Sequence, residues 1–163
     1  MSDMDLVDEE HDEMYEESLN SKYLSFQLGQ EAYGIGIKYV SEIIELQKIS
    51  EVPDSPFYVK GVINLRGKII PVVDLRLKFG MEEREYDDRT CIILVALDEG
   101  DTGLIVDTVK EVVDIPLDDI DYNESNGINN SNISGIGKNG DGVIILINAE
   151  NLIKDVEVKG FFS

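Results

Sequence analysis

Residues 61–76 read GVINLRGKIIPVVDLR, two apolar runs joined by Arg66-Gly67-Lys68. Val62–Leu65 and Ile69–Val73 each have the length and the Ile/Val content of a β-strand. Because Gly67 eases a tight reversal, the stretch predicts a β-hairpin with Arg66 at its tip. Pro71 lies inside the second run and predicts that this strand lies at a sheet edge or carries a bulge. Arg66 is then either a solvated turn residue or a residue that meets a partner.

Runs of the same kind continue on both sides of this hairpin, separated by Gly, Pro, Asn or Asp, whereas helical periodicity is weak throughout. This pattern is typical of an all-β sandwich or barrel. The further strands predicted are Tyr23–Leu28, Tyr33–Ile37, Glu42–Leu46, Cys91–Leu97, Gly103–Val106, Val112–Ile115 and Val143–Asn148. Short helices are predicted at Ile37–Ser41, Leu75–Phe79, Asp107–Lys110 and Ala149–Ile153, and a long exposed loop at Asp118–Asn132.

The chain also repeats itself. Gly34–Val40 and the Glu42-Ile43-Ile44 that follows resemble the segment Gly103–Val113 at an offset of 69 residues. The hairpin run ending at Asp74 resembles the run ending at Asn148 at an offset of 74 residues. Two tandem β units are the simplest account. Since each copy is too short to bury much surface alone, we expect the two units to share an apolar interface.

Composition and charge disfavour several classes of function. The 163 residues are 42% hydrophobic with a net charge of −20, which fits a globular protein and disfavours nucleic-acid binding. Residues 1–18 hold nine acids and no Lys or Arg, so the first 20 residues are predicted to be a disordered acidic tail. No apolar run is long enough to insert in a membrane, and the N-terminus does not read as a signal peptide, so a cytoplasmic location is predicted.

Residues suited to catalysis are scarce. The single His11 lies in the acidic tail, and the single Cys91 opens a β-run, where it is read as a small core residue or, less simply, as a reactive thiol. With one His and one Cys the usual zinc site is not available. Gly135–Gly140 matches G-x-G-x-x-G but precedes a β-run, so it is read as a hairpin rather than a dinucleotide site. No enzyme activity, metal or cofactor is predicted.

The quoted stretch and the repeat together resemble one family. Tyr33-Gly34-Ile35, Val40-Ser41-Glu42-Ile43 and the run Val59–Arg76 are similar to CheW, the bacterial chemotaxis coupling family. The resemblance spans about Lys22–Ile153 and leaves the acidic tail outside. It implies two SH3-like five-stranded β-barrels packed through a shared hydrophobic interface, with a few short helices. We expect the domain to cover residues 21–158, the first barrel about 31–88 and the second about 89–148, with 159–163 as a C-terminal tail. Which barrel the N-terminal strand completes stays open.

The resemblance also implies partners and sites. CheW-like proteins couple the cytoplasmic signalling tips of chemoreceptors to the regulatory domain of the histidine kinase CheA, in membrane-associated arrays. The groove that faces the receptor corresponds to Ile37, Val40, Gly61, Val62, Cys91 and Val109. Glu42 and Arg66 fall at positions that support the coupling surface, and we expect them to form an ion pair. The kinase contact is expected around Ile44, Leu46 and Ile49.

Two other functions compete with this interpretation. The first is a CheW-like scaffold that serves a different receptor and kinase pathway. The second is an enzyme or small-ligand module on a β-barrel, which the scarcity of His and Cys disfavours. Binding to a chemoreceptor fragment and to the regulatory domain of CheA would separate the alternatives.

Overall fold

The computed structural model describes residues 19–98, 100–122 and 130–154. The chain forms strands with short helical turns between them, and the predicted all-β class is confirmed. The strands are β1 Lys22–Leu28, β2 Glu31–Gly36, β3 Val40–Glu45, β4 Val59–Leu65, β5 Lys68–Asp74, β6 Cys91–Leu97, β7 Gly100–Val106, β8 Thr108–Asp114, β9 Ile120–Tyr122, β10 Ile133–Asn139 and β11 Gly142–Ile147. The helical segments are η1 Ile37–Tyr39, α2 Leu75–Lys78, η2 Leu117–Asp119 and α4 Ala149–Lys154.

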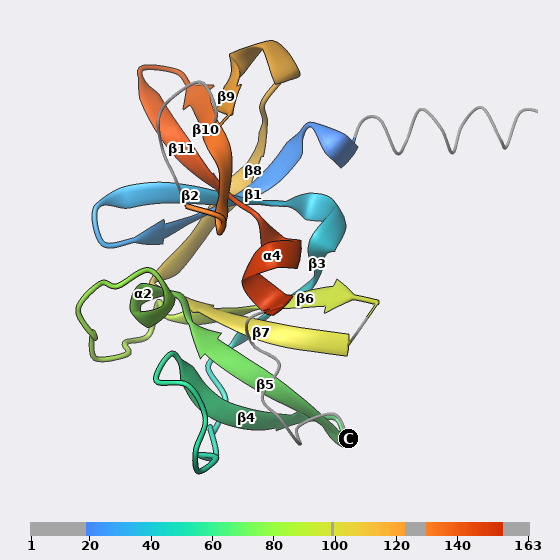
Figure 1. Ribbon diagram of the computed structural model, residues 1–163, viewed down its shortest axis with the longest axis vertical. Helices are drawn as coiled ribbons and strands as arrows, with labels where there is room; N and C mark the ends of the chain where they lie inside the picture. The colour runs from blue at the N-terminus through green and yellow to red at the C-terminus, as the bar shows by residue number, and fades with distance from the viewer. Residues whose placement is uncertain (1–18, 99, 123–129, 155–163) are drawn as a thin grey trace, which may run out of the picture.

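The strands form two sheets, and each sheet closes into a small barrel. One has the order β3-β6-β7-β5-β4 and is called here the central barrel, since it uses the contiguous residues 40–106. Ser50, beyond β3, closes it by exchanging two backbone hydrogen bonds of 2.9 Å with Val62 of β4. The other has the order β8-β1-β2-β11-β10-β9 and is called the terminal barrel. Figure 1 shows the terminal barrel above the central one, with α2 and α4 between them.

Each barrel contains strands from both repeats. At the offsets of 69 and 74, β1, β2 and β3 correspond to β6, β7 and β8, and β4 and β5 correspond to β10 and β11. Apart from β9, which has no named counterpart in the central barrel, the two sheets therefore have the same order of equivalent strands. The hairpin β6–β7 of the second repeat completes the first repeat's barrel, and β1–β2 completes the other. Neither repeat is a barrel by itself.

Two glycines mark the points of exchange. Gly34 of β2 lies opposite Leu146 of β11, and Gly103 of β7 lies opposite Val72 of β5, in the two parallel pairings. A Cβ on Gly103 would lie 2.8 Å from side-chain carbons of Ile92 and Val72. A Cβ on Gly34 would lie 3.0 Å from Ile144. Glycine recurs in both copies because the crossing strands leave no room for a side chain.

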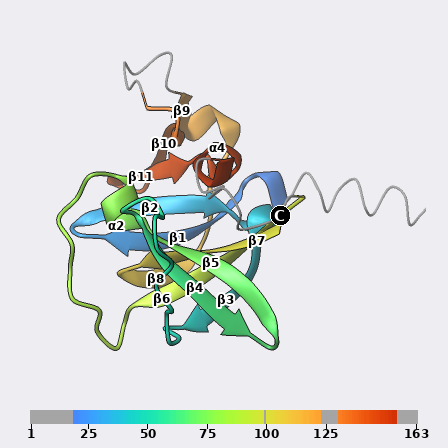
Figure 2. The same cartoon turned by 60° about the horizontal axis from the view of Figure 1, so that its bottom comes forward.

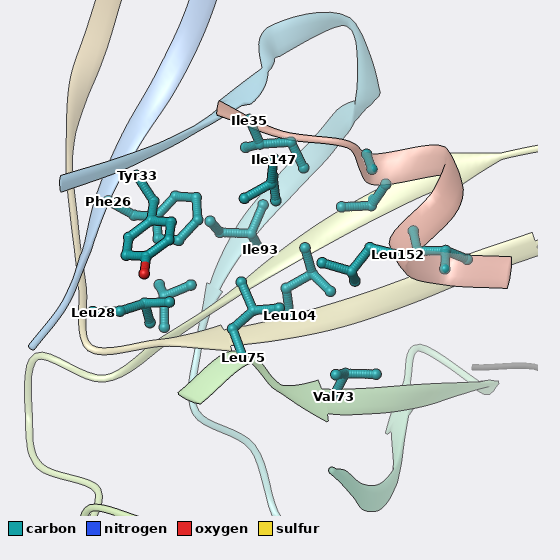
Figure 3. Packing of buried hydrophobic residues seen from close by; sticks show 14 of the residues in the cluster. Phe26, Leu28, Tyr33, Ile35, Val73, Leu75, Ile93, Leu104, Ile147 and Leu152 are labelled. Carbon is teal, nitrogen blue, oxygen red and sulfur yellow. The ribbon is translucent and has the colours of Figure 1, made fainter. Parts of the chain in front are cut away.

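The core is divided in three, with one cluster inside each barrel and a larger one between them. The central barrel encloses a cluster that includes Ile63, Ile92 and Ile105, and the terminal barrel one with Ile115 and Leu146. The largest cluster, called here the inter-barrel cluster, joins both sheets and α4 (Figure 3). It confirms the predicted shared interface. Its labelled members in the figure are Phe26, Leu28, Tyr33, Ile35, Val73, Leu75, Ile93, Leu104, Ile147 and Leu152.

The strand order divides the chain differently from the expected boundaries at residues 31–88 and 89–148. Strands β6 and β7, which follow residue 88, pair with β3 and β5 in the central barrel. Strand β2, at residues 31–36, pairs with β1 and β11 in the terminal barrel, so the N-terminal strand belongs to the terminal barrel. The repeat was visible in the sequence, but the exchange of hairpins depends on long-range pairing. Of the expected tails, residues 1–20 and 159–163, only Leu19 and Asn20 lie among the described residues.

Pro71 does not place β5 at an edge, because β5 lies between β4 and β7. Pro71 faces Val62, whose N–H and C=O both bond to Ser50 on the far side of β4. The missing N–H of Pro71 therefore points toward β7, whose pairing begins only at Val72. The predicted irregularity is present, but it lies in β4, between Val59 and Gly61.

Two local predictions fail. The helix expected at Asp107–Lys110 is instead the start of β8, because Thr108 and Val109 pair with β1. The loop expected at Asp118–Asn132 contains η2 and β9, whose Ile120 is buried in the terminal barrel. The interpretation of Gly135–Gly140 as part of a hairpin is confirmed, since β10 pairs with β11 up to Asn139 and Gly142. A Cβ on Gly137 would lie 2.9 Å from Ile115, so small residues are needed there.

Candidate interaction surfaces

The hairpin that opened the sequence analysis is formed as predicted. Leu65 of β4 pairs with Lys68 of β5, which leaves a two-residue turn at Arg66 and Gly67. Both turn residues have positive φ, 52° and 85°, as in the turns that match the twist of a hairpin. The side chain of Asn64 accepts a hydrogen bond from the Gly67 N–H at 3.0 Å. Arg66 therefore lies in a turn whose conformation is held by the strand pairing and by the hydrogen bond to Asn64.

The predicted ion pair between Arg66 and Glu42 is confirmed. Arg66 Nη2 lies 2.6 Å from Glu42 Oε2, and Nη1 donates to Oε1 at 3.3 Å. The hydrogen bond from Arg66 lowers the pKa of Glu42 below its usual value, against a smaller opposing effect of burial. Glu42 lies on β3 and Arg66 at the end of β4, and these two strands are the edges of the sheet. The pair therefore bridges the two edges at the end of the central barrel where the β4–β5 hairpin turns, called here its mouth. Arg66 remains 68% exposed, so part of the guanidinium is available to a partner.

Gly61 and Val62 lie at the seam of the central barrel. Gly61 is buried, has a φ of 145°, and would place a Cβ 2.1 Å from the carbonyl oxygen of Ser50. Its backbone is therefore one that only glycine fits. Val62 is half-buried beside it. The structure gives Gly61 a packing role, independent of any partner.

The four remaining residues that were predicted to face the receptor lie at the junction of the barrels. Ile37 of η1, Val40 of β3, Cys91 of β6 and Val109 of β8 are each half-buried and pack against the inter-barrel cluster. Val40 and Val109 are equivalent at the offset of 69. Cys91 has a free thiol that donates to the Arg89 carbonyl at 3.1 Å, in keeping with a small packed residue. The predicted set therefore divides into this group and the Arg66 group on the barrel mouth.

Two exposed residues on the same strands were missed. Ile43 of β3 is 45% exposed and Val112 of β8 is 51% exposed. Ile43 lies opposite Ile93, and Val112 lies opposite Leu24, so both lie on the sheet faces that carry the inter-barrel cluster. They are repeat equivalents, and that signal was in the sequence. What the sequence lacked was the bulge in each pairing, which sets the side that each residue faces.

The residues expected to contact the kinase lie on the central barrel. Ile44, Leu46 and Ile49 are half-buried, and each packs against the cluster inside that barrel. They follow one another from β3 into the segment that closes the barrel at Ser50. More exposed apolar side chains of the same barrel are Phe57, at 73%, and Ile69, at 57%.

Among the described residues, no group of three or more His, Cys, Asp or Glu side chains is arranged to hold a metal ion. None of the helices within those residues is long and apolar enough to cross a membrane. What the surface offers instead is half-buried apolar strands at a junction of two barrels, and a charged pair at one barrel mouth. Surfaces of this kind bind other proteins.

Comparison with known proteins also indicates a protein that binds other proteins. The model of the CheW-like domain family matches residues 22–157. The chemotaxis protein CheW of Klebsiella aerogenes is 32% identical over 144 residues, which is 87% of each chain. CheW of Helicobacter pylori is 33% identical, over 82% of this chain and 81% of its own. The crystal structure of the scaffolding protein CheW from Thermoanaerobacter tengcongensis superposes with a TM-score of 0.76 at 36% identity, covering 88% of this chain and 97% of that one.

Fold and surface thus define a protein-interaction module built from two interlocked β-barrels. The chain belongs to the CheW-like family and is a chemotaxis scaffold protein.

Proposed function

We propose that the protein couples the cytoplasmic tips of chemoreceptors to the regulatory domain of the histidine kinase CheA, and that it does so in the cytoplasm, without catalysis or a cofactor, at membrane-associated arrays. The observation that carries the proposal is the pair of equivalent strands β3 and β8. Each presents an exposed aliphatic residue, Ile43 or Val112, beside half-buried Val40 or Val109. Aliphatic side chains next to a packed core form the desolvated centre that a partner needs.

The receptor tip would bind at this junction, through Ile37, Val40, Ile43, Cys91, Val109 and Val112. Glu42 and Arg66 would support the adjoining mouth of the central barrel, where Arg66 has donors left for a carboxylate. Gly61 and Val62 would hold the seam on which Arg66 is mounted. The kinase would contact the central barrel around Ile44, Leu46 and Ile49, near exposed Phe57 and Ile69.

The test is a binding assay of the 163-residue chain with a receptor signalling fragment and, separately, with the regulatory domain of CheA. We expect both to bind the wild-type chain. Ile43→Ser should weaken receptor binding by roughly tenfold or more, since a central apolar anchor contributes about 2 kcal/mol. It should leave kinase binding and the melting temperature nearly unchanged, because Ile43 is 45% exposed.

Val143→Ser is the matched control, since Val143 is an aliphatic strand residue of similar exposure, 51%, on β11. Equal losses in both variants would remove β3 from the receptor surface. Failure of the wild-type chain to bind either partner would overturn the coupling function. Binding only to the receptor and kinase of another pathway would favour the scaffold of a different system.

A further inference from the structure

Helices α2 and α4 occupy equivalent places between the barrels (Figure 1). At the offset of 74, Leu75 corresponds to Ala149 and Asp74 to Asn148. Each helix is capped in the same way: the Asp74 carboxylate accepts the Leu77 N–H at 3.3 Å, and the Asn148 side chain accepts the Asn151 N–H at 3.0 Å. The surroundings of the two helices can therefore be compared position by position.

Beside α2, the junction of the barrels is closed by the segment 80–90, called here the strap. Arg76 of α2 bonds to Asp107 through Nε and Nη2, both at 2.7 Å. Asp107 also accepts the Gly29 N–H at 2.8 Å and Arg84 Nη1, from the strap, at 3.0 Å. Tyr86 of the strap donates to the buried Asp74 at 2.7 Å. This network ties α2, the β1–β2 turn and the strap into one packed side.

Beside α4, the equivalent place is a surface hollow of about 630 Å³. Its floor is apolar and its rim carries both signs of charge. Glu150 stands where α2 has Arg76, and Lys38 stands where Asp107 does, so the charges are exchanged. Glu150 accepts a hydrogen bond from Tyr39 at 3.2 Å, and Lys38 donates to Asn20 at 3.4 Å. The hollow is lined, among others, by Lys38, Tyr39, Ala96, Leu97, Glu150 and Ile153.

We propose that residues 155–163 of this chain bind in the hollow as the counterpart of the strap. The strap leaves α2 at Gly80, and its equivalent is Lys154, which itself lines the hollow. The residues that follow, DVEVKGFFS, carry Val156, Val158, Phe161 and Phe162 among alternating charges. Apolar side chains suit the floor at Leu97 and Ile153, and the mixed charges suit the rim. Bound there, the segment would contact Leu97 and Ile153, two residues that line the hollow.

The chain contains no Trp, so one introduced indole reports on the segment without background. In Phe161→Trp, we expect emission shifted to the blue and acrylamide quenching reduced relative to the unfolded chain. Adding Ala96→Arg, which blocks the hollow from an exposed strand position, should shift the emission to the red and restore quenching. Val143→Arg on the same background is the control and should change neither.

Emission of the native Phe161→Trp chain that matches the unfolded chain would overturn the proposal, as would a blue shift that Ala96→Arg leaves in place. A blue shift lost on dilution would also overturn it, by assigning the hollow to a second copy. A second measurement covers poor folding of the blocked variant: Phe161→Ser with Phe162→Ser should speed amide hydrogen exchange at Leu97 and Ile153, and unchanged exchange would count against binding.

Discussion

Arg66 stands at a turn position that suits glycine better. Its φ of 52° is uncommon for a residue with a side chain, and its equivalent in the second repeat, with a φ of 62°, is Gly140. Both hairpin turns therefore need a residue with a left-handed backbone conformation, and one of the two has arginine there instead of glycine. A conformational cost kept at an exposed site points to a use beyond folding. The bidentate contact with Glu42 supplies the geometry for that use.

Replacing Arg66 tests this separation of stability from binding. Arg66→Gly should leave the melting temperature unchanged or raise it, because glycine relieves the backbone and the exposed ion pair contributes little. Binding to the receptor fragment or the kinase domain should weaken. Arg66→Lys, which keeps the charge but not the planar fork, should be intermediate. A severe loss of melting temperature in Arg66→Gly, with normal binding by the folded fraction, would make Arg66 structural.

Gly61 should behave in the opposite way. Gly61→Ala places a Cβ against the Ser50 carbonyl at a φ of 145°, so it should lower the free energy of unfolding by about 3 kcal/mol or more. Gly67→Ala is the control: its φ is also positive, at 85°, but no atom lies within 4 Å of the added Cβ. Urea denaturation of both variants measures the difference. Similar small losses in both would mean that the seam at Ser50 relaxes.

At the scale of elements, the two sides of the barrel junction contain the equivalent helices α2 and α4, but different interactions stabilise them. On the α2 side, Asp107 has a side chain only 10% exposed and draws on Arg76, Arg84 and the Gly29 amide. Although burial alone raises the pKa of Asp107, these partners, Arg76 first, lower it below the usual value. A short helix, a turn and a loop thus depend on one carboxylate.

Arg76→Ala should lower the free energy of unfolding by about 2–3 kcal/mol near neutral pH, since it leaves the largely buried carboxylate of Asp107 with fewer partners. The lowered pKa of Asp107 means that this stability is present above the unfolded pKa and is lost as pH falls through the folded value. The difference between variant and wild type should therefore shrink in acid. Lys68→Ala, which removes the exposed pair with Asp101, is the control and should cost little. An equal cost in both variants, measured by urea denaturation, would contradict the special place of Asp107.

For the whole molecule, the exchange of hairpins makes the two repeats one cooperative unit. Each barrel takes β6–β7 or β1–β2 from the other repeat, and the inter-barrel cluster draws on both. Figure 2 shows the two sheets from a second direction, and β1 contacts β7 across the junction. A repeat taken alone would expose the residues that it contributes to that cluster.

Fragments cut between the repeats test this cooperativity. Residues 1–89 and 90–163 should each lack stable β-structure by circular dichroism as separate monomers. Mixed in equal amounts, they should regain the spectrum of the intact chain as a one-to-one complex, observed by size-exclusion chromatography. Either fragment folding alone as a monomer would show that hairpin exchange is dispensable.

Local information in the sequence determined most of the strands, the hairpin at Arg66 and the repeat. Period-two alternation and glycine at turns act within a few residues, so they can be seen along the chain. The Arg66–Glu42 pair was also predicted, because the resemblance to the CheW family places both residues at one surface and an arginine can bind a carboxylate through two hydrogen bonds.

The tertiary structure decided which strands share a barrel, which side Ile43 and Val112 face, and why Gly61 is glycine. Each of these depends on pairing between segments far apart in sequence, and a one-residue bulge is enough to turn a side chain from one face to the other. The tertiary structure alone also shows the hollow beside α4 and the filled place beside α2, since a repeat in sequence shows which positions correspond but not what occupies the space between them.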